Sequence, residues 1–203
     1  MFDRLKISGI VPVIALEDES RAVPLGKALL DGGIPVAEIT FRTAAAANII
    51  RRLTAELPDL LVGAGTVLTT AQADDAASAG AKFLVAPGLN PRVVEHAQNR
   101  GLPIIPGCAT PSDIERALEL GLDTVKFFPA EQAGGLNYIK AVAAPYRGVK
   151  FLPTGGINAA NLQSYLKFDR VIAVGGSWMI CEDLERVTSL CREAVRLVKE
   201  VRA

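Results

Sequence analysis

The stretch Leu122-Asp-Thr-Val-Lys126-Phe-Phe-Pro-Ala130 places one lysine inside a segment that otherwise has the composition of a buried strand. β-Branched and aromatic residues favour strands and proline ends them, so this stretch predicts a strand that stops at Pro129. Side chains alternate across a strand, which puts Thr124, Lys126 and Phe128 on one face. The Lys126 amine then lies either at a solvated rim or in a dry pocket, where burial favours the neutral, nucleophilic form.

This strand is one of eight that alternate with helical segments. Strands are expected at 10–16, 36–41, 60–63, 82–86, 103–105, 124–128, 150–152 and 171–174, and helices at 20–30, 44–57, 69–79, 91–100, 111–121, 135–144, after a cap at Asn158, and at 183–201. Strand–helix units joined by short turns are typical of a (β/α)₈ (TIM) barrel. A doubly wound open sheet has the same alternation, but the even count and the unit of roughly 25 residues favour a closed barrel.

The composition predicts one domain spanning residues 1–203, long enough for a substantial core. Twenty-two basic residues balance 22 acidic ones, so nucleic acid and anionic membranes are poor candidates as partners. The three cysteines lack a Cys-x-x-Cys spacing, which indicates a reducing compartment without disulfides or structural zinc. The apolar run 10–16 is too short for a signal peptide, and no run has the length of a bilayer span. We therefore expect a cytoplasmic protein.

Reactive groups and glycine-rich turns follow the predicted strands, at the end where barrels carry their chemistry. They are Glu38, Thr40 and Arg42 in the second strand, Gly63-Ala-Gly-Thr66 in the third, Ala86-Pro-Gly88 after the fourth, Lys126 in the sixth, Pro153-Thr-Gly-Gly156 after the seventh and Gly175-Gly-Ser177 after the eighth. Glycine-rich turns that precede helices also bind anions, and the turns after strands seven and eight hold phosphate in many barrels.

Each of these features also has a purely structural interpretation. Glu38 and Arg42 are able to form a simple ion pair, and the glycine pairs to serve only as tight turns. Cys108, Trp178 and Met179 are expected to pack in the core, and the single histidine, His96, to lie on a helix away from the strand ends. With one histidine and no acidic cluster, a metal site has little support.

Two stretches, Gly33-Ile-Pro-Val-Ala-Glu38-Ile-Thr-Phe-Arg42 and Gly121-Leu-Asp-Thr-Val-Lys126-Phe-Phe-Pro-Ala130, resemble the two signatures of the 2-keto-3-deoxy-6-phosphogluconate (KDPG) / 4-hydroxy-2-oxoglutarate (KHG) aldolase family. Gly63-Ala-Gly-Thr-Val67, Thr154-Gly-Gly-Ile157 and Gly175-Gly-Ser-Trp178 also look like its motifs, as does Ala86-Pro-Gly88. The resemblance covers essentially the whole chain. It implies a metal-independent class I lyase without a cofactor, assembled as a homotrimer of (β/α)₈ barrels.

The resemblance also implies a role for each matching residue. Lys126 would form the Schiff base and Glu38 would be the general acid and base. The remaining positions would bind the substrate: Arg42 and Thr66 its pyruvyl carboxylate, Pro87 the water relay to Glu38, Phe128 the pocket wall, Thr154 the hydroxyls of the aldehyde part, and Gly155, Gly156, Gly176 and Ser177 its phosphate.

Lys126 and Glu38 suit this chemistry. An amine and a 2-keto acid form an iminium, which accepts the electrons of a breaking C3–C4 bond. The expected reaction is cleavage of KDPG to pyruvate and glyceraldehyde 3-phosphate, with KHG or the galactonate epimer as alternative substrates. A phosphosugar isomerase would need a second acid–base pair or a metal. A non-catalytic barrel that senses a phosphorylated metabolite is the alternative outside enzymes, and intact Lys126 and Glu38 argue against it.

Overall fold

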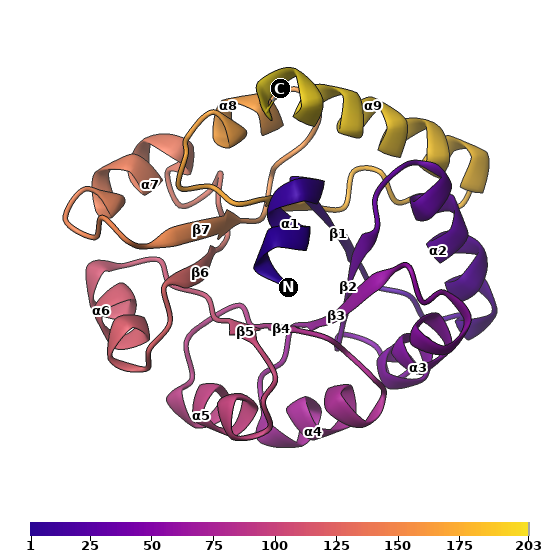
Figure 1. Ribbon diagram of the computed structural model, residues 1–203, viewed down its shortest axis with the longest axis horizontal. Coiled ribbons are helices and arrows are strands. Elements are labelled where there is room, and N and C mark those ends of the chain that lie inside the picture. Colours follow the sequence, from indigo (N-terminus) through magenta and orange to yellow (C-terminus); the bar gives the residue numbers. More distant parts are fainter. Residues whose placement is uncertain (203) are drawn as a thin grey trace.

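The computed structural model describes residues 1–202, in which eight parallel strands alternate with helices (Figure 1). The strands are β1 (Ile10–Ile14), β2 (Val36–Thr40), β3 (Leu61–Gly65), β4 (Leu84–Val85), β5 (Ile104–Ile105), β6 (Thr124–Phe127), β7 (Lys150–Pro153) and β8 (Val174–Gly176). The helices are α1 (Phe2–Ser8), η1 (Glu19–Arg21, a 3₁₀ turn), α2 (Ala22–Asp31), α3 (Ala46–Glu56), α4 (Thr70–Ser78), α5 (Pro91–Asn99), α6 (Pro111–Glu119), α7 (Gly135–Ala143), α8 (Leu162–Leu166) and α9 (Leu184–Arg202).

The strands form two parallel sheets, the larger of them curled, with helices on the outer side (Figure 1). Six strands pair in the order β5-β4-β3-β2-β1-β8, and β6 pairs with β7 in a separate two-stranded sheet. Isolated parallel bridges join the two sheets, from Gly107 to Lys126 on one side, and from Phe151 to Val171 and Thr154 to Gly175 on the other. In residues 1–202, no helix has the length and apolar composition needed to cross a bilayer.

Side-chain alternation along the strands creates two hydrophobic clusters. In β2, Ala37 and Ile39 belong to the large cluster that includes the helices, whereas Val36 points to the inner face. The inner cluster consists of Leu5, Val11, Val36, Leu61, Phe83, Val85, Ile105, Leu152, Ile172 and Ala173. Its Leu5 comes from α1, which lies at the centre of the ring in Figure 1. Apolar side chains therefore fill the interior near the strands' N-terminal ends, below the polar residues that follow.

The predicted helix starts at Thr69, Pro91 and Pro111 are confirmed. Thr69 forms a capping box with Gln72 at the start of α4, and Thr110 forms one with Asp113 at the start of α6. Pro91 and Pro111 occupy first-turn positions of their helices, where a missing backbone N–H costs nothing. The apolar spacing of α9 buries one face of that helix: Val187, Cys191, Ala194 and Val198.

Two predicted boundaries are wrong. Asn158 does not cap the following helix: its amide oxygen accepts from the N–H of Ala160 in a turn, and α8 begins at Leu162. The last strand lies at Val174–Gly176, shifted from the expected β-branched run 171–174. The glycines are required there, because a Cβ on Gly175 would lie 2.3 Å from the Thr154 hydroxyl oxygen, and one on Gly176 would lie 2.0 Å from the Trp178 ring.

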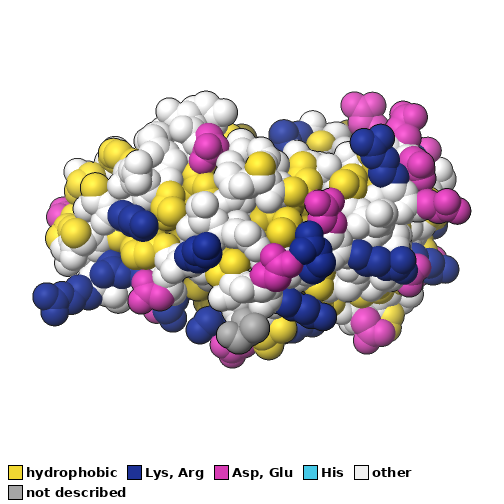
Figure 2. Space-filling view, turned by 90° about the horizontal axis from the view of Figure 1, so that it is seen from above, with side chains coloured by type: hydrophobic (Ala, Val, Ile, Leu, Met, Phe, Trp, Pro, Cys, Tyr) yellow, Lys and Arg dark blue, Asp and Glu magenta, His cyan; other side chains and the backbone are white. Residues whose placement is uncertain are grey.

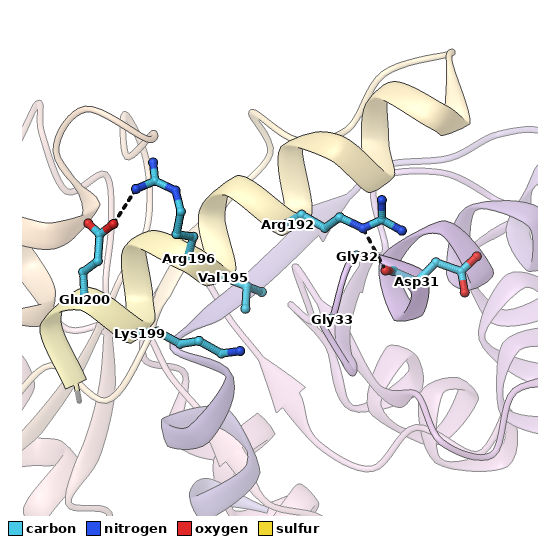
Figure 3. Close-up of a pocket in the computed structure, with 8 residues that line it drawn as sticks. All are labelled: Asp31, Gly32, Gly33, Arg192, Val195, Arg196, Lys199 and Glu200. Atoms are coloured by element: carbon cyan, nitrogen blue, oxygen red, sulfur yellow. Dashed lines mark hydrogen bonds and ion pairs between the residues drawn. The ribbon is translucent and has the colours of Figure 1, made fainter.

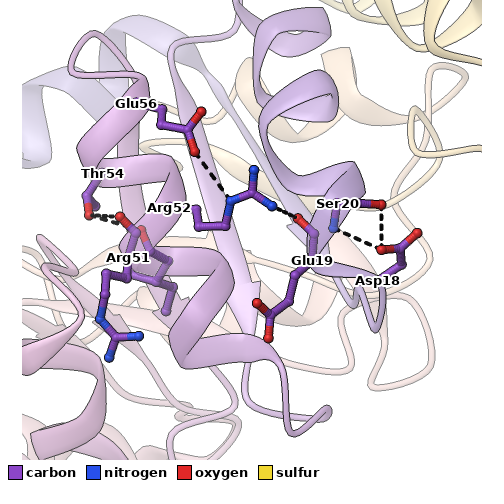
Figure 4. A network of polar contacts seen from close by, with 8 residues as sticks. Asp18, Glu19, Ser20, Arg51, Arg52, Thr54 and Glu56 are labelled. Atoms are coloured by element: carbon purple, nitrogen blue, oxygen red, sulfur yellow. Dashed lines mark hydrogen bonds and ion pairs between the residues drawn. The ribbon is translucent and has the colours of Figure 1, made fainter.

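Polar contacts anchor the loop that leaves β1 (Figure 4). Arg52 of α3 donates from Nη1 to the Glu19 carbonyl oxygen at 2.7 Å and from Nε to Glu56 Oε1 at 3.3 Å. The Ser20 hydroxyl and N–H both donate to Asp18, which holds the pKa of that carboxyl below its usual value. These contacts fix the loop beside the end of β2.

Candidate active site

Lys126 and Glu38 meet in the interior of the curled sheet. Lys126 lies on β6 and Glu38 on β2, and the lysine Nζ is 3.5 Å from Glu38 Oε1. The side chains are 6% and 0% exposed, so the amine lies in a dry pocket and not at a solvated rim. The backbone of Lys126 is held on both sides, because its N–H donates to the Pro106 carbonyl oxygen and its own carbonyl oxygen accepts from the N–H of Cys108, both at 2.8 Å.

The space for Glu38 depends on a glycine in the neighbouring strand. A Cβ on Gly65 of β3 would lie 2.1 Å from Glu38 Oε1, so no larger residue fits beside this carboxylate. The sequence does not indicate which residue Gly65 approaches, although a glycine inside a strand is a signal of close approach. The second carboxylate oxygen, Oε2, is buried and accepts no hydrogen bond from residues 1–202. Leaving such an atom unpaired is unfavourable for stability, so Glu38 offers a free acceptor in the site.

Arg42 and Thr66 lie near the ends of β2 and β3. The exposed Arg42 donates from Nε to the Thr40 hydroxyl oxygen at 3.2 Å, while the ion-pair partner of Glu38 is Lys126. The simple Glu38–Arg42 ion pair is therefore absent from the described residues. Thr66 adopts φ 56°, a left-handed conformation that is strained for a β-branched residue and is often found at functional sites.

Pro87 and Phe128 belong to loops that follow strands. The loop after β4 contacts the segment after β5, since a Cβ on Gly107 would lie 2.0 Å from the Pro87 carbonyl oxygen. Phe128 follows β6 and is 40% exposed, with its ring centroid 5.4 Å from Lys126 Nζ. Its ring thus lies beside the amine while also facing solvent.

Thr154 and the two glycine turns are neighbours. Thr154 directly follows β7, is 6% exposed, and its hydroxyl has no partner among residues 1–202. Gly155 and Gly156 follow with φ 103° and 76°, values that side chains rarely adopt. The Thr154–Gly175 bridge brings these turns next to the end of β8, where Ser177 is exposed.

Comparison with known proteins matches residues 1–190 to the family described as "KDPG and KHG aldolase". The chain belongs to this family. It is 48% identical to a 2-dehydro-3-deoxy-phosphogluconate aldolase of Treponema pallidum, over 98% of this chain and 97% of that one. It is 42% identical to the KHG/KDPG aldolase of Escherichia coli, over 94% and 92%. The crystal structure of the KDPG aldolase of Legionella pneumophila, with pyruvate captured as a covalent carbinolamine, superposes with a TM-score of 0.91 at 40% identity, covering 96% and 97%.

The sequence predicts that His96 lies on a helix away from the strand ends and that Cys108 and Met179 pack in the core, and the structure agrees. His96 of α5 has Nε2 2.8 Å from Asp74 Oδ1 of α4, and its hydrogen bond lowers the pKa of that carboxyl. Burial raises the pKa of the Cys108 thiol to about 12, and Met179 is fully buried. Residues 1–202 contain no cluster of three or more His, Cys, Asp or Glu side chains that could hold a metal ion.

A surface hollow of about 610 Å³ lies elsewhere on this aldolase-family chain (Figure 3). It is lined by α9 and by the segment 31–33, which precedes β2, so it opens beside the N-terminal end of that strand. Arg192 donates there to the Asp31 carbonyl oxygen, and Arg196 pairs with Glu200. A second hollow of about 780 Å³ shares Lys199 with it. From above, basic side chains are spread over this side of the molecule among acidic and apolar ones (Figure 2).

Proposed function

We propose that this chain is a class I aldolase that cleaves KDPG to pyruvate and glyceraldehyde 3-phosphate through a Schiff base on Lys126. The observation that carries the proposal is the buried Lys126 amine 3.5 Å from the buried Glu38 carboxylate. The family match supports it, as does the covalent carbinolamine of pyruvate in the Legionella relative.

The proposed steps use only these two groups and water. Lys126 first passes a proton to Glu38, and the neutral amine attacks the C2 carbonyl to give a carbinolamine. Glu38 returns that proton to the carbinolamine hydroxyl, which leaves as water, so that an iminium and the Glu38 carboxylate remain. Glu38 accepts the proton of the C4 hydroxyl, and the electron pair of the breaking C3–C4 bond moves to the iminium, which becomes an enamine. Glyceraldehyde 3-phosphate leaves. Glu38 returns the proton to C3, and water hydrolyses the new iminium to pyruvate and free Lys126.

The surrounding residues would orient the substrate. Arg42 supplies a guanidinium fork for the pyruvyl carboxylate, and Thr66 a second donor from its strained position. Pro87 would line the water relay to Glu38, and Phe128 would form the pocket wall. Thr154 presents an unpaired buried hydroxyl to the hydroxyls of the aldehyde part, and the phosphate would lie at Gly155, Gly156, Gly176 and Ser177.

The same proposal includes the architecture implied by the family resemblance. The eight strands would close into one (β/α)₈ barrel that forms a single domain over residues 1–203, and the bridges Gly107–Lys126 and Thr154–Gly175 support closure at both seams. The assembly would be a homotrimer, which analytical ultracentrifugation tests directly.

The decisive experiment measures turnover of KDPG together with covalent trapping. Pyruvate plus borohydride should inactivate the enzyme and leave a reduced adduct on the peptide that contains Lys126. A chelator should leave turnover intact, because the iminium is the electron sink. Labelling of another lysine, or activity lost on chelation and restored by a divalent cation, would overturn the assignment. Binding of KDPG without turnover would indicate a non-catalytic barrel that senses a phosphorylated metabolite.

The Escherichia coli relative is named for both KHG and KDPG, and this favours KHG as a second substrate. KHG lacks the phosphate. It would use Lys126, Glu38, and the site at Arg42 and Thr66 that binds the pyruvyl carboxylate. Side-by-side kcat/KM values for KDPG, KHG and the galactonate epimer rank the three.

A further inference from the structure

We propose that Thr40 is a positioning residue that aims the Arg42 guanidinium at the carboxylate of the keto acid. The proposal rests on the function above, in which Arg42 binds that carboxylate. Thr40 is the last residue of β2, lies two positions from both Glu38 and Arg42, and is only 1% exposed.

The Thr40 hydroxyl connects a backbone carbonyl to the guanidinium. It lies 3.0 Å from the carbonyl oxygen of Ile14 on β1 and 3.2 Å from Nε of Arg42. A carbonyl oxygen only accepts and an arginine N–H only donates, so the direction of both hydrogen bonds is fixed. Thr40 donates to Ile14 and accepts from Arg42. The rigid end of the sheet thereby determines where Nε points.

This arrangement leaves the outer part of the guanidinium free for a ligand. Because Thr40 occupies Nε, the Nη1 and Nη2 groups remain as a parallel fork that matches a carboxylate. Arg42 is exposed and its side chain has considerable rotamer freedom, which binding would otherwise have to restrict. Orienting the fork before the ligand arrives lowers that cost.

A purely structural role for Thr40 would be to join β1 to β2. Backbone pairing already joins them there, with Val13 opposite Glu38 and Ile14 opposite Ile39. A neighbouring hydroxyl provides a matched control: Thr43 donates to the Leu16 carbonyl oxygen at 2.8 Å. That bond also connects the end of β2 to the chain leaving β1, but it does not involve Arg42.

The test compares Thr40→Val with Thr43→Val. Thr40→Val removes the acceptor with little change in volume, and we expect the KM for KDPG and the half-maximal pyruvate concentration in borohydride trapping to rise about tenfold. The kcat should stay within about twofold, since Lys126 and Glu38 are untouched. Thr40→Ser should restore the wild-type KM, and Thr43→Val should leave it unchanged. Thr40→Cys, with a weak acceptor and similar volume, replaces Thr40→Val if that variant is insoluble.

Two further measurements separate positioning from general damage. In an Arg42→Ala background, Thr40→Val should add nothing to the KM, because the residue acts through Arg42. Trapping of acetone, which lacks the carboxylate, should be equal in wild type and Thr40→Val. Additive effects in the double variant, an unchanged KM in Thr40→Val, or an equal rise in Thr43→Val would overturn the proposal. Absence of trapping in the wild-type enzyme would instead refute the proposed function.

Discussion

Lys126 Nζ and Glu38 Oε1 lie 3.5 Å apart although 88 residues separate them in the chain. This distance exceeds the roughly 2.7–2.9 Å of a tight charge-assisted hydrogen bond. Burying two ionisable groups with one long contact is a poor way to stabilise a fold, because desolvation is costly and Glu38 Oε2 has no donor in residues 1–202. The arrangement is better explained by chemistry, in which the amine must leave the carboxylate to attack a carbonyl.

The first prediction separates the duties of these two residues. Glu38→Gln keeps the shape but removes the base, so pyruvate should still be trapped on Lys126 while KDPG turnover falls. General acid–base catalysis typically contributes about 10²–10⁴-fold, and kcat should fall within that range. Steady-state kinetics and borohydride trapping on the same preparation make the comparison. A near wild-type kcat would reduce Glu38 to a structural partner of Lys126.

Local signals in the sequence predicted much of the fold. The cap at Thr69, the first-turn prolines, and the glycines just past helix ends depend on neighbours within a few positions, so most helix boundaries are predicted closely. The alternation in β6 put Lys126 on one face with Thr124 and Phe128 and left open whether the amine is solvated, and the strand-end rule put it at the same end as Glu38. The resemblance then supplies the role proposed for each residue.

Features that depend on distant residues were not predictable. The sequence offers Arg42, four positions away, as an ion-pair partner of Glu38, but folding pairs Glu38 with Lys126 and Arg42 with Thr40. The shift of β8 onto Gly175 depends on where Thr154, from the end of another strand, lies. No local pattern contains that information, because each contact is made by a strand or loop elsewhere in the chain.

The second prediction concerns the apolar interior. Leu5 of α1 is fully buried in the inner cluster, so Leu5→Ala should lower the free energy of unfolding by about 2–5 kcal/mol. Ile7 of the same helix is 79% exposed, and Ile7→Ala should change the free energy of unfolding by less than about 0.5 kcal/mol. Urea unfolding measures both. Equal losses in the free energy of unfolding for the two variants would mean that α1 does not close the interior. The kcat/KM of either folded variant should match wild type.

The third prediction concerns thiol reactivity. Burial raises the pKa of both Cys108 and Cys191 to about 12, so at pH 8 only about one in ten thousand of these groups is a thiolate. Cys181 is only partly buried. Iodoacetamide should therefore modify Cys181 alone in the folded protein and all three cysteines in guanidinium, as peptide mass spectrometry would reveal. Cys181→Ser should abolish native-state labelling, and rapid modification of Cys108 would contradict the burial of this side chain after β5.

The last prediction tests the placement of the phosphate. Removing the hydroxyl in Ser177→Ala should weaken transition-state binding of KDPG by about 1.5–3 kcal/mol, the value of a hydrogen bond to a charged group when no water replaces it. Gly176→Val should weaken KDPG binding more, because even the Cβ of the new side chain would lie 2.0 Å from the Trp178 ring. The loss should be selective: kcat/KM for KDPG should fall while the rate of pyruvate–borohydride inactivation hardly changes. Pyruvate has no phosphate, and in the proposed site its carboxylate is bound by Arg42 and Thr66. KHG provides a second control for the same reason. Equal losses with KDPG, KHG and pyruvate would mean that these turns only support the fold, and the phosphate would have to bind elsewhere.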